Sequence, residues 1–272
     1  MPASAGWYYS VNEGGQIDLP PVILIHGAGG THLNWSAEMR RMPDQRVIAV
    51  DLPGHGRSAG FGQQSILAYA EGLRGFLDEL GLHEAVLVGH SMGGAVALTL
   101  ALKYPQYAAG LGLIATGAYL GVDPALTEEL SNSATVQIGL HRLQSLAFSP
   151  SSSPALVEAC MKPLREQRTS LLLADWLACA SFDLRELVDQ IRAPAWVACG
   201  ADDRITPLPF ANFLAARLPE AVLQIVPTAG HMVILEQPRQ VADGLSRFLS
   251  LHLTRIQSYR AQLALARSRR AP

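Results

Sequence analysis

The chain lacks an excess of charge of either sign. Among its 272 residues, 21 Lys and Arg stand against 23 Asp and Glu, which leaves a formal net charge of −2. Without a strong summed field, binding to nucleic acid or to an anionic lipid surface is not favoured. Long apolar runs are also missing, because four glycines interrupt the uncharged stretch 106–122. We expect a soluble protein that binds a small molecule, without nucleic acid and without stable membrane insertion.

Cysteine is scarce as well. Cys160, Cys179 and Cys199 are odd in number, widely spaced and without metal-ligand spacing, which argues against a disulfide framework and a metal site. We expect them to be buried free thiols in a reducing compartment. Residues 1–10 lack the cationic residue and the apolar run that open a secretory signal peptide. The cytoplasm is therefore the expected location, and the sequence does not indicate an oligomeric state.

Short apolar runs recur along the chain with helical patterns between them. The expected strands are Val22–Ile25, Val47–Val50, Ala85–Val88, Gly110–Ala115, Ala195–Ala198 and Ala221–Val226. The expected helices between the first four are Leu33–Arg41, Ser65–Leu80 and Met92–Tyr104. Continuous apolar strands that alternate with helices are typical of a sheet buried on both faces. The pattern predicts an α/β fold with a mostly parallel sheet.

The alternation stops between residues 116 and 192. Helical patterns there cover Pro124–Ala134, Val136–Phe148, Pro154–Gln167 and Thr169–Ala180. We expect a helical cap (lid) inserted at 116–192 over the ligand-binding end of the sheet, with a core formed by 1–115 and 193–272. A separate helical domain is the alternative. The arginine-rich tail 251–272 is expected to be a solvated last helix, or else a basic amphipathic helix that touches a partner or a membrane surface.

The pattern Gly-x-Ser-x-Gly occurs twice, at Ser58 and at Ser91. A nucleophilic serine in this pattern needs a strand that runs into a sharp turn and then a helix, so that the hydroxyl group is exposed on a strained backbone. Only Ser91 has this context, because the apolar run 85–88 precedes it and the Ala- and Leu-rich segment 92–104 follows. Ser58 lies in a glycine-rich stretch typical of a loop. Ser91 is therefore the candidate nucleophile.

A serine hydroxyl group needs a base to remove its proton, and the base needs an acid that holds its tautomer. His231 follows the last expected strand, whereas most other histidines lie in glycine-rich turns, in a loop or in the tail. His231 is therefore the candidate base. For the acid, Asp202 and Asp203 both follow the expected strand 195–198, and periodicity does not separate them.

Three segments resemble motifs of the α/β-hydrolase fold superfamily, and of its carboxylesterases in particular. His26–Gly30 (HGAGG) is similar to the oxyanion loop, Asp51–Ser58 (DLPGHGRS) to the Asp-x-x-Gly-x-Gly-x-Ser turn, and Gly89–Gly94 (GHSMGG) to the nucleophile elbow. The chain also has the family's order Ser, Asp, His. The resemblance covers nearly the whole chain and implies a mostly parallel sheet with helices on both faces and a helical cap.

The resemblance also implies roles for individual residues. Asp203, followed by Pro207, matches the family's Asp-x-x-x-Pro pattern and would carry the acid. The oxyanion hole would use the backbone amides of Met92 and Ala28, or that of Gly29 if the loop is shifted by one residue.

These observations lead to an expected reaction. Ser91 would attack small apolar carboxylic esters and form an acyl-enzyme, with His231 as the base and Asp203 as the residue that orients it, without a metal or an organic cofactor. The alternatives are a carbon–carbon bond hydrolase or an enol-lactonase of the same fold, and a ligand-binding or signalling protein that kept the scaffold. The carbon–carbon hydrolases that the chain resembles typically carry Asn before the serine, so His90 favours a carboxylesterase.

Overall fold

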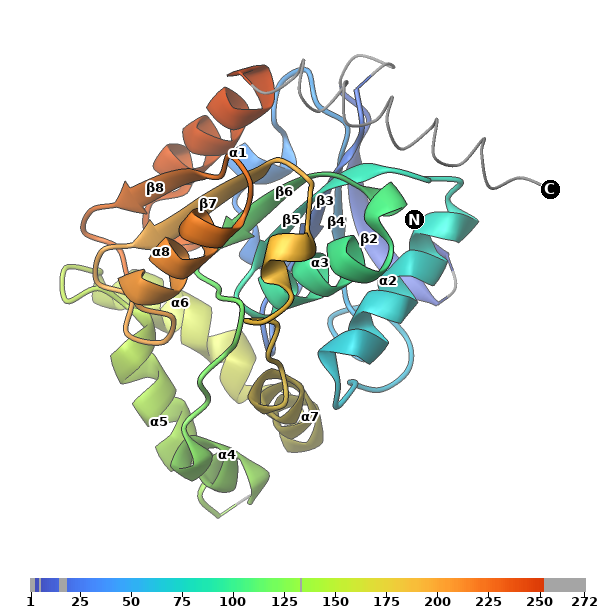
Figure 1. Cartoon of the computed structure of the whole chain (residues 1–272). Helices are drawn as coiled ribbons and strands as arrows, with labels where there is room; N and C mark the ends of the chain where they lie inside the picture. The colour runs from blue at the N-terminus through green and yellow to red at the C-terminus, as the bar shows by residue number, and fades with distance from the viewer. Residues whose placement is uncertain (1–2, 5, 15–18, 133, 252–272) are drawn as a thin grey trace.

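A single sheet organises the molecule (Figure 1). The computed structural model describes residues 3–4, 6–14, 19–132 and 134–251. Within them, eight strands pair in the order β1-β2-β4-β3-β5-β6-β7-β8, and every pair from β4 to β8 is parallel. β1 and β2 are antiparallel additions at the β4 edge. The strands are β1 (Ala3–Ser4), β2 (Trp7–Asn12), β3 (Val22–Ile25), β4 (Val47–Val50), β5 (Ala85–His90), β6 (Ala108–Ile114), β7 (Ala195–Gly200) and β8 (Val222–Val226).

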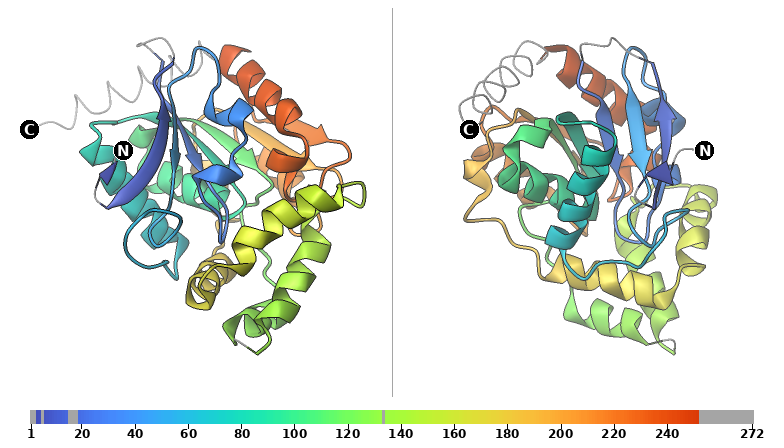
Figure 2. Two further views of the ribbon diagram at one scale, coloured as in Figure 1. Left: turned by 180° about the vertical axis from the view of Figure 1, so that it is seen from behind. Right: turned by 90° about the vertical axis from the view of Figure 1, so that its right-hand side faces the viewer.

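Helices cover both faces of the sheet, as Figure 2 shows from two sides. One face carries α2 (Ile66–Glu79), α3 (Met92–Lys103) and α8 (Leu208–Arg217); the other carries α1 (Ala37–Arg40), α9 (Val233–Glu236) and the helix 238–251. Successive strand residues point to opposite faces. Ile23 and Ile25 accordingly pack with the first group of helices, and Val22 and Leu24 with the second. The predicted mostly parallel sheet with helices on both faces is confirmed.

Four further helices lie together beside one end of the sheet (Figure 1). They are α4 (Pro124–Ser131), α5 (Val136–Ala147), α6 (Pro154–Arg165) and α7 (Thr169–Ala180). They share an apolar cluster of their own, which includes Leu130, Leu140 and Trp176. The two chain connections to this group lie side by side, because Tyr119 and Asp183 form an isolated β-bridge. All four helices agree with the sequence pattern, while the division into a core and a cap stays a prediction.

The single helix predicted at Leu33–Arg41 is wrong. The structure has a 3-10 helix, η1 (His32–Asn34), and the separate short helix α1. Thr31 and Ser36 each begin a helix, because each side chain accepts a hydrogen bond from a backbone N–H two or three residues later. Trp35 lies between the two helices with an extended backbone, at φ −82° and ψ 128°. Competition from these polar side chains divides a segment whose apolar residues alone suggest one helix.

The sequence pattern did not predict β1 and β2. Along β2 only Trp7 is buried, and the other five residues are half-buried. The strand lies next to the sheet edge and therefore lacks the continuous apolar run by which the central strands were found.

Three remaining predictions concern the cysteines, the membrane and the tail. All three cysteines are free, and Cys179 and Cys199 are buried as expected; Cys160 is half-buried, so the prediction is wrong for its burial. In the part of the chain that the structure describes, no helix is long and apolar enough to cross a membrane. Residues 252–272, on which the prediction for the tail depends, lie outside the described residues.

Candidate active site

The chain turns sharply at Ser91, between β5 and α3. Ser91 has φ 54° and ψ −119°, a conformation that residues other than glycine rarely adopt. A Cβ atom on Gly89 would collide with the backbone of Gly93, and a Cβ atom on Gly93 would lie 2.6 Å from the carbonyl oxygen of His26. The turn therefore requires residues without a Cβ atom at both glycine positions of the Gly-x-Ser-x-Gly pattern. It presents the half-buried Ser91 beyond the carboxyl end of a parallel strand.

Side chains from three distant segments meet at this turn. Oγ of Ser91 lies 2.9 Å from Nε2 of His231, which follows β8. Nδ1 of His231 lies 3.1 Å from Oδ2 of Asp203, which follows β7. Asp203 is 4% exposed and His231 is 5% exposed. The structure thus brings together the predicted nucleophile, base and acid in an arrangement that lets an imidazole remove a hydroxyl proton.

The loop around Asp203 aims its carboxylate at the imidazole. Oδ1 accepts the backbone N–H groups of Ile205 and Thr206, each at 2.9 Å, and Oδ2 accepts the Thr206 hydroxyl at 2.9 Å. Burial by itself raises the pKa of Asp203, but the charge of His231 and these hydrogen bonds outweigh burial, so the pKa lies below its ordinary value. Asp203 is ionised at neutral pH, and it holds the His231 tautomer that carries its hydrogen on Nδ1.

Asp202 and Ser58, the alternatives to Asp203 and Ser91, form hydrogen bonds with other groups. Oδ2 of Asp202 accepts the hydroxyl of Ser149 at 2.6 Å. Oγ of Ser58 donates to the backbone carbonyl of Asp51 at 2.5 Å and accepts the backbone N–H of Tyr8 at 2.8 Å. Ser58 is therefore part of a turn and has neither the strand nor the helix that flank the other Gly-x-Ser-x-Gly serine.

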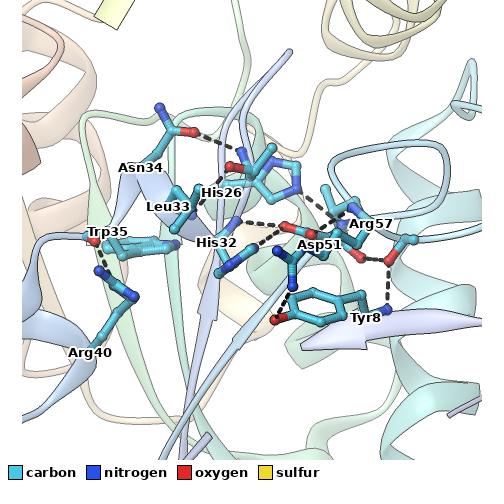
Figure 3. A network of polar contacts seen from close by, with 12 residues as sticks. Tyr8, His26, His32, Leu33, Asn34, Trp35, Arg40, Asp51 and Arg57 are labelled. Carbon is cyan, nitrogen blue, oxygen red and sulfur yellow. Dashed lines mark hydrogen bonds and ion pairs between the residues drawn. The ribbon is translucent and has the colours of Figure 1, made fainter. Parts of the chain in front are cut away.

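Asp51 lies at the centre of the polar network in Figure 3. Its Oδ1 accepts from the backbone N–H and the Nδ1 of His32, at 2.7 and 2.8 Å, and its Oδ2 accepts from the backbone N–H of Arg57 at 2.9 Å. Burial raises the pKa of Asp51, but these hydrogen bonds lower the pKa by more than burial raises it, so the pKa lies below its ordinary value. The carboxylate thus closes the DLPGHGRS turn. Neither this cluster nor any other group of three or more His, Cys, Asp or Glu among the described residues could hold a metal ion.

His90 has a contact that the sequence did not reveal. Its Nε2 donates to the backbone carbonyl of His231 at 2.8 Å. Burial and the charge of His231 lower the pKa of His90 to about 3, so the ring is neutral and carries its single hydrogen on Nε2. On the other side, the backbone N–H of Met232 donates to the carbonyl of Ala147 at 3.1 Å. The backbone of the candidate base is held from both directions, by residues too far away in sequence for a local pattern to indicate.

The loop after β3 lies against the turn at Ser91, which we call the elbow. A Cβ atom on Gly27 would lie 3.2 Å from the Cβ atom of the candidate nucleophile. The backbone N–H groups of Ala28 and Met92 donate to no group among the described residues, whereas that of Gly29 donates to Oδ2 of Asp175 at 2.7 Å. Gly29 is therefore already engaged. Ala28 and Met92 are left as candidate oxyanion donors, and Met92 has the added field of the α3 N-terminus.

Comparison with known proteins extends this picture. The model of the alpha/beta hydrolase family matches residues 22–244. The chain is 35% identical over 259 residues to the dihydrolipoyllysine-residue acetyltransferase component of the acetoin cleaving system of Pseudomonas putida, which covers 90% of this chain and 66% of that protein. It is 29% identical over 258 residues to a 2-hydroxy-6-oxo-6-phenylhexa-2,4-dienoate hydrolase of Burkholderia cepacia, which covers 87% of this chain and 88% of that one.

The chain is also similar to a solved structure. The thermophilic esterase of Thermogutta terrifontis matches with a TM-score of 0.80 and 27% identity, over 90% of this chain and 93% of that chain. The chain spans about two thirds of the length of the acetyltransferase component. Because the family model matches most of its length, the chain belongs to the alpha/beta hydrolase family.

Proposed function

We propose that the protein is a serine hydrolase that cleaves small apolar carboxylic esters through an acyl-enzyme on Ser91. The observation that carries the proposal is the 2.9 Å contact between Oγ of Ser91 and Nε2 of His231, backed by the 3.1 Å contact between Nδ1 and Asp203. A serine hydroxyl group becomes a useful nucleophile only beside such an oriented base. The similarity to the Thermogutta terrifontis esterase supports the ester as the bond that is cleaved.

The reaction begins when Oγ of Ser91 attacks the ester carbonyl carbon and Nε2 of His231 accepts the hydroxyl proton. The amides of Ala28 and Met92 donate to the oxyanion, each worth about 3 kcal/mol. Collapse of the tetrahedral intermediate releases the alcohol, to which His231 returns the proton, and the acyl group stays on Oγ. His231 then removes a proton from water, and the resulting hydroxide attacks the acyl-enzyme. When the second tetrahedral intermediate collapses, the acid is released and His231 returns the proton to Oγ of Ser91. Asp203 holds the Nδ1 hydrogen and stabilises the imidazolium in both steps.

Residues 116–192 are assigned as a cap that selects the acyl or alcohol part of the substrate. Their apolar cluster extends to Ile205 and Met232, which are close in sequence to the candidate acid and base. A Cβ atom on Gly29 would lie 2.8 Å from Cδ2 of Leu172, so α7 also covers the oxyanion loop. Apolar side chains on two sides of the site favour a substrate with an apolar part.

The proposal is tested with nitrophenyl esters of graded acyl length and a serine-reactive phosphonate. Ser91→Ala should lower turnover by about a millionfold, because the residues of such a triad act as a unit. Ser58→Ala removes the serine of the other Gly-x-Ser-x-Gly pattern and should keep wild-type turnover. The phosphonate should label the wild type and Ser58→Ala but not Ser91→Ala. Near-normal activity of Ser91→Ala would end the proposal.

Hydrolysis of a carbon–carbon bond in a 2-hydroxy-6-oxo-dienoate is the second candidate, favoured by the similarity to the Burkholderia cepacia hydrolase. Assays of one preparation with such a dienoate, an enol-lactone and the esters separate the reactions by kcat/KM. The ester should be preferred. A ligand-binding role would instead give slow phosphonate labelling and, with every substrate, turnover far below about one per second, the lower end of the ordinary enzymatic range.

A further inference from the structure

A second set of buried ionisable groups lies next to the candidate active site. Asp175, on α7, is 0% exposed. Its Oδ2 accepts the backbone N–H of Gly29 at 2.7 Å and Nε2 of His55 at 2.8 Å, and its Oδ1 accepts the hydroxyl of Tyr69 at 2.5 Å. Burial of a carboxylate is costly unless donors and a counter-charge compensate it. Asp175 has both, from three segments that are remote from it in sequence.

The counter-charge is His55. Its Nδ1 lies 3.1 Å from the backbone carbonyl of Pro53, and its Nε2 faces the carboxylate of Asp175. A carbonyl and a carboxylate are both hydrogen-bond acceptors, so this arrangement favours a hydrogen on each ring nitrogen and therefore the imidazolium form of His55. Burial lowers the pKa of His55, but the hydrogen bond and charge of Asp175 outweigh it, so the pKa lies above its ordinary value. The α7 helix is thereby joined to the DLPGHGRS turn by a buried ion pair.

Gly29 links this pair to the oxyanion loop. Its N–H belongs to the same planar peptide group as the carbonyl of Ala28. When Asp175 fixes the direction of that N–H, it also fixes ψ of Ala28, and so the direction of the Ala28 amide relative to the elbow. The side-chain amide of Gln167, just after α6, donates to the carbonyl of Gly29 at 3.4 Å. Both polar groups of Gly29 are therefore held by the helical insertion.

We propose that Asp175 is a positioning residue for the reaction at Ser91, and that through it α7 aims the Ala28 amide at the oxyanion. This inference rests on the proposed function, because it assigns Asp175 a part in the same acyl transfer. The insertion then has two tasks: its apolar side chains select the substrate, and its one fully buried carboxylate among α4–α7 completes the oxyanion hole. An insertion that only covered the site would not need this charge.

The test compares Asp175→Ala with Tyr69→Phe, which removes another hydrogen bond to the same carboxylate but does not touch Gly29. Asp175→Ala should lower kcat by about 10- to 100-fold with little change in KM. A misdirected Ala28 N–H stabilises the oxyanion of the transition state less well, whereas binding of the uncharged ester depends less on this hydrogen bond. Phosphonate labelling of Ser91 should slow in parallel. Tyr69→Phe should lower the melting temperature and leave kcat unchanged. Equal kcat losses in the two variants, or no loss in Asp175→Ala, would overturn the proposal.

Asp175→Asn decides the matter if the alanine variant does not fold. The amide keeps an acceptor for Gly29 but loses the charge, so kcat should fall below the wild-type value by about 10-fold or less while KM stays unchanged. An unchanged kcat contradicts the proposal. Amide hydrogen exchange of a peptide covering 26–34 should accelerate in Asp175→Asn but not in Tyr69→Phe. If the wild type neither turns over esters nor reacts with the phosphonate, the proposed function fails and this role with it. An active wild type with an unaffected Asp175 variant overturns the positioning role alone.

Discussion

Asp202 and Asp203 are identical neighbours with opposite surroundings. Asp203 is buried and accepts hydrogen bonds from two backbone amides and the hydroxyl group of Thr206, in addition to its contact with His231. Asp202 is half-buried and its carboxylate accepts the Ser149 hydroxyl. A carboxylate held by its own loop keeps one rotamer, which is what an orienting acid requires.

Replacing these two residues one at a time separates the roles. Asp203→Asn should lower kcat about ten-thousandfold, because an amide favours the wrong His231 tautomer and does not stabilise the imidazolium. Asp202→Asn should keep kcat and lose at most about 1 kcal/mol of unfolding free energy, from the weaker hydrogen bond to Ser149. Both quantities come from ester kinetics and urea denaturation. Similar kcat losses in the two variants would show that the acid is wrongly assigned.

At the scale of elements, the elbow depends on how closely α3 approaches β3. A Cβ atom on Gly93, in the first turn of α3, would collide with the carbonyl oxygen of Ile25 at the end of β3. In α2, by contrast, a Cβ atom on Gly75 would meet nothing within 4 Å. The two helical glycines therefore differ in kind: one allows a close approach of backbones, and the other only lowers helix propensity.

Alanine at each glycine should change the stability in opposite directions. Gly93→Ala should lower the unfolding free energy by about 3 kcal/mol or more, since neither backbone can move without disturbing the sheet. Gly75→Ala should raise it by about 0.5–1 kcal/mol, because alanine loses less conformational entropy in a helix. Urea denaturation of both variants measures the change. A Gly93→Ala protein as stable as the wild type would refute the close approach.

For the whole molecule, burial gives the histidines different protonation states. Burial and the charge of His55 lower the pKa of His26 to about 3, and that of His90 is also about 3, against an ordinary value of 6.5. Between pH 6.5 and about pH 3 the unfolded chain binds a proton on each of these two imidazoles and the folded chain does not. The unfolding free energy therefore falls as the pH drops through this range. The raised pKa of His55 acts in the other direction: its stabilisation is complete below pH 6.5 and is lost as the pH rises through its folded value.

His90→Asn tests this acid dependence. Each imidazole whose pKa is lowered makes the unfolding free energy change by about 1.4 kcal/mol per pH unit. From pH 6.5 to pH 5 the wild type should therefore lose about 2 kcal/mol more unfolding free energy than the variant. Urea denaturation at the two pH values gives both differences. Comparing each protein with itself removes any effect of the substitution at pH 6.5. Parallel losses in the two proteins would mean that His90 does not stay neutral in the folded chain.

Local patterns in the sequence were sufficient for much of this description. The central strands and the four helices α4–α7 follow from runs and spacings within a few residues, and so does the strand–turn–helix context of Ser91. The antiparallel strand β2, next to the sheet edge, and the division at Trp35 did not follow, because partial burial near a sheet edge and capping by side chains compete with periodicity there.

Only the tertiary structure decided which groups meet around Ser91. Asp203 rather than Asp202 faces His231, and the Gly29 amide is taken by Asp175 across 146 positions of the chain. His90 holds a carbonyl that lies 141 positions away. A turn or a helix is determined by interactions between near neighbours in sequence, and so it leaves a local pattern. A contact between remote residues depends on how the sheet and helices pack, and no short segment of the sequence contains that information.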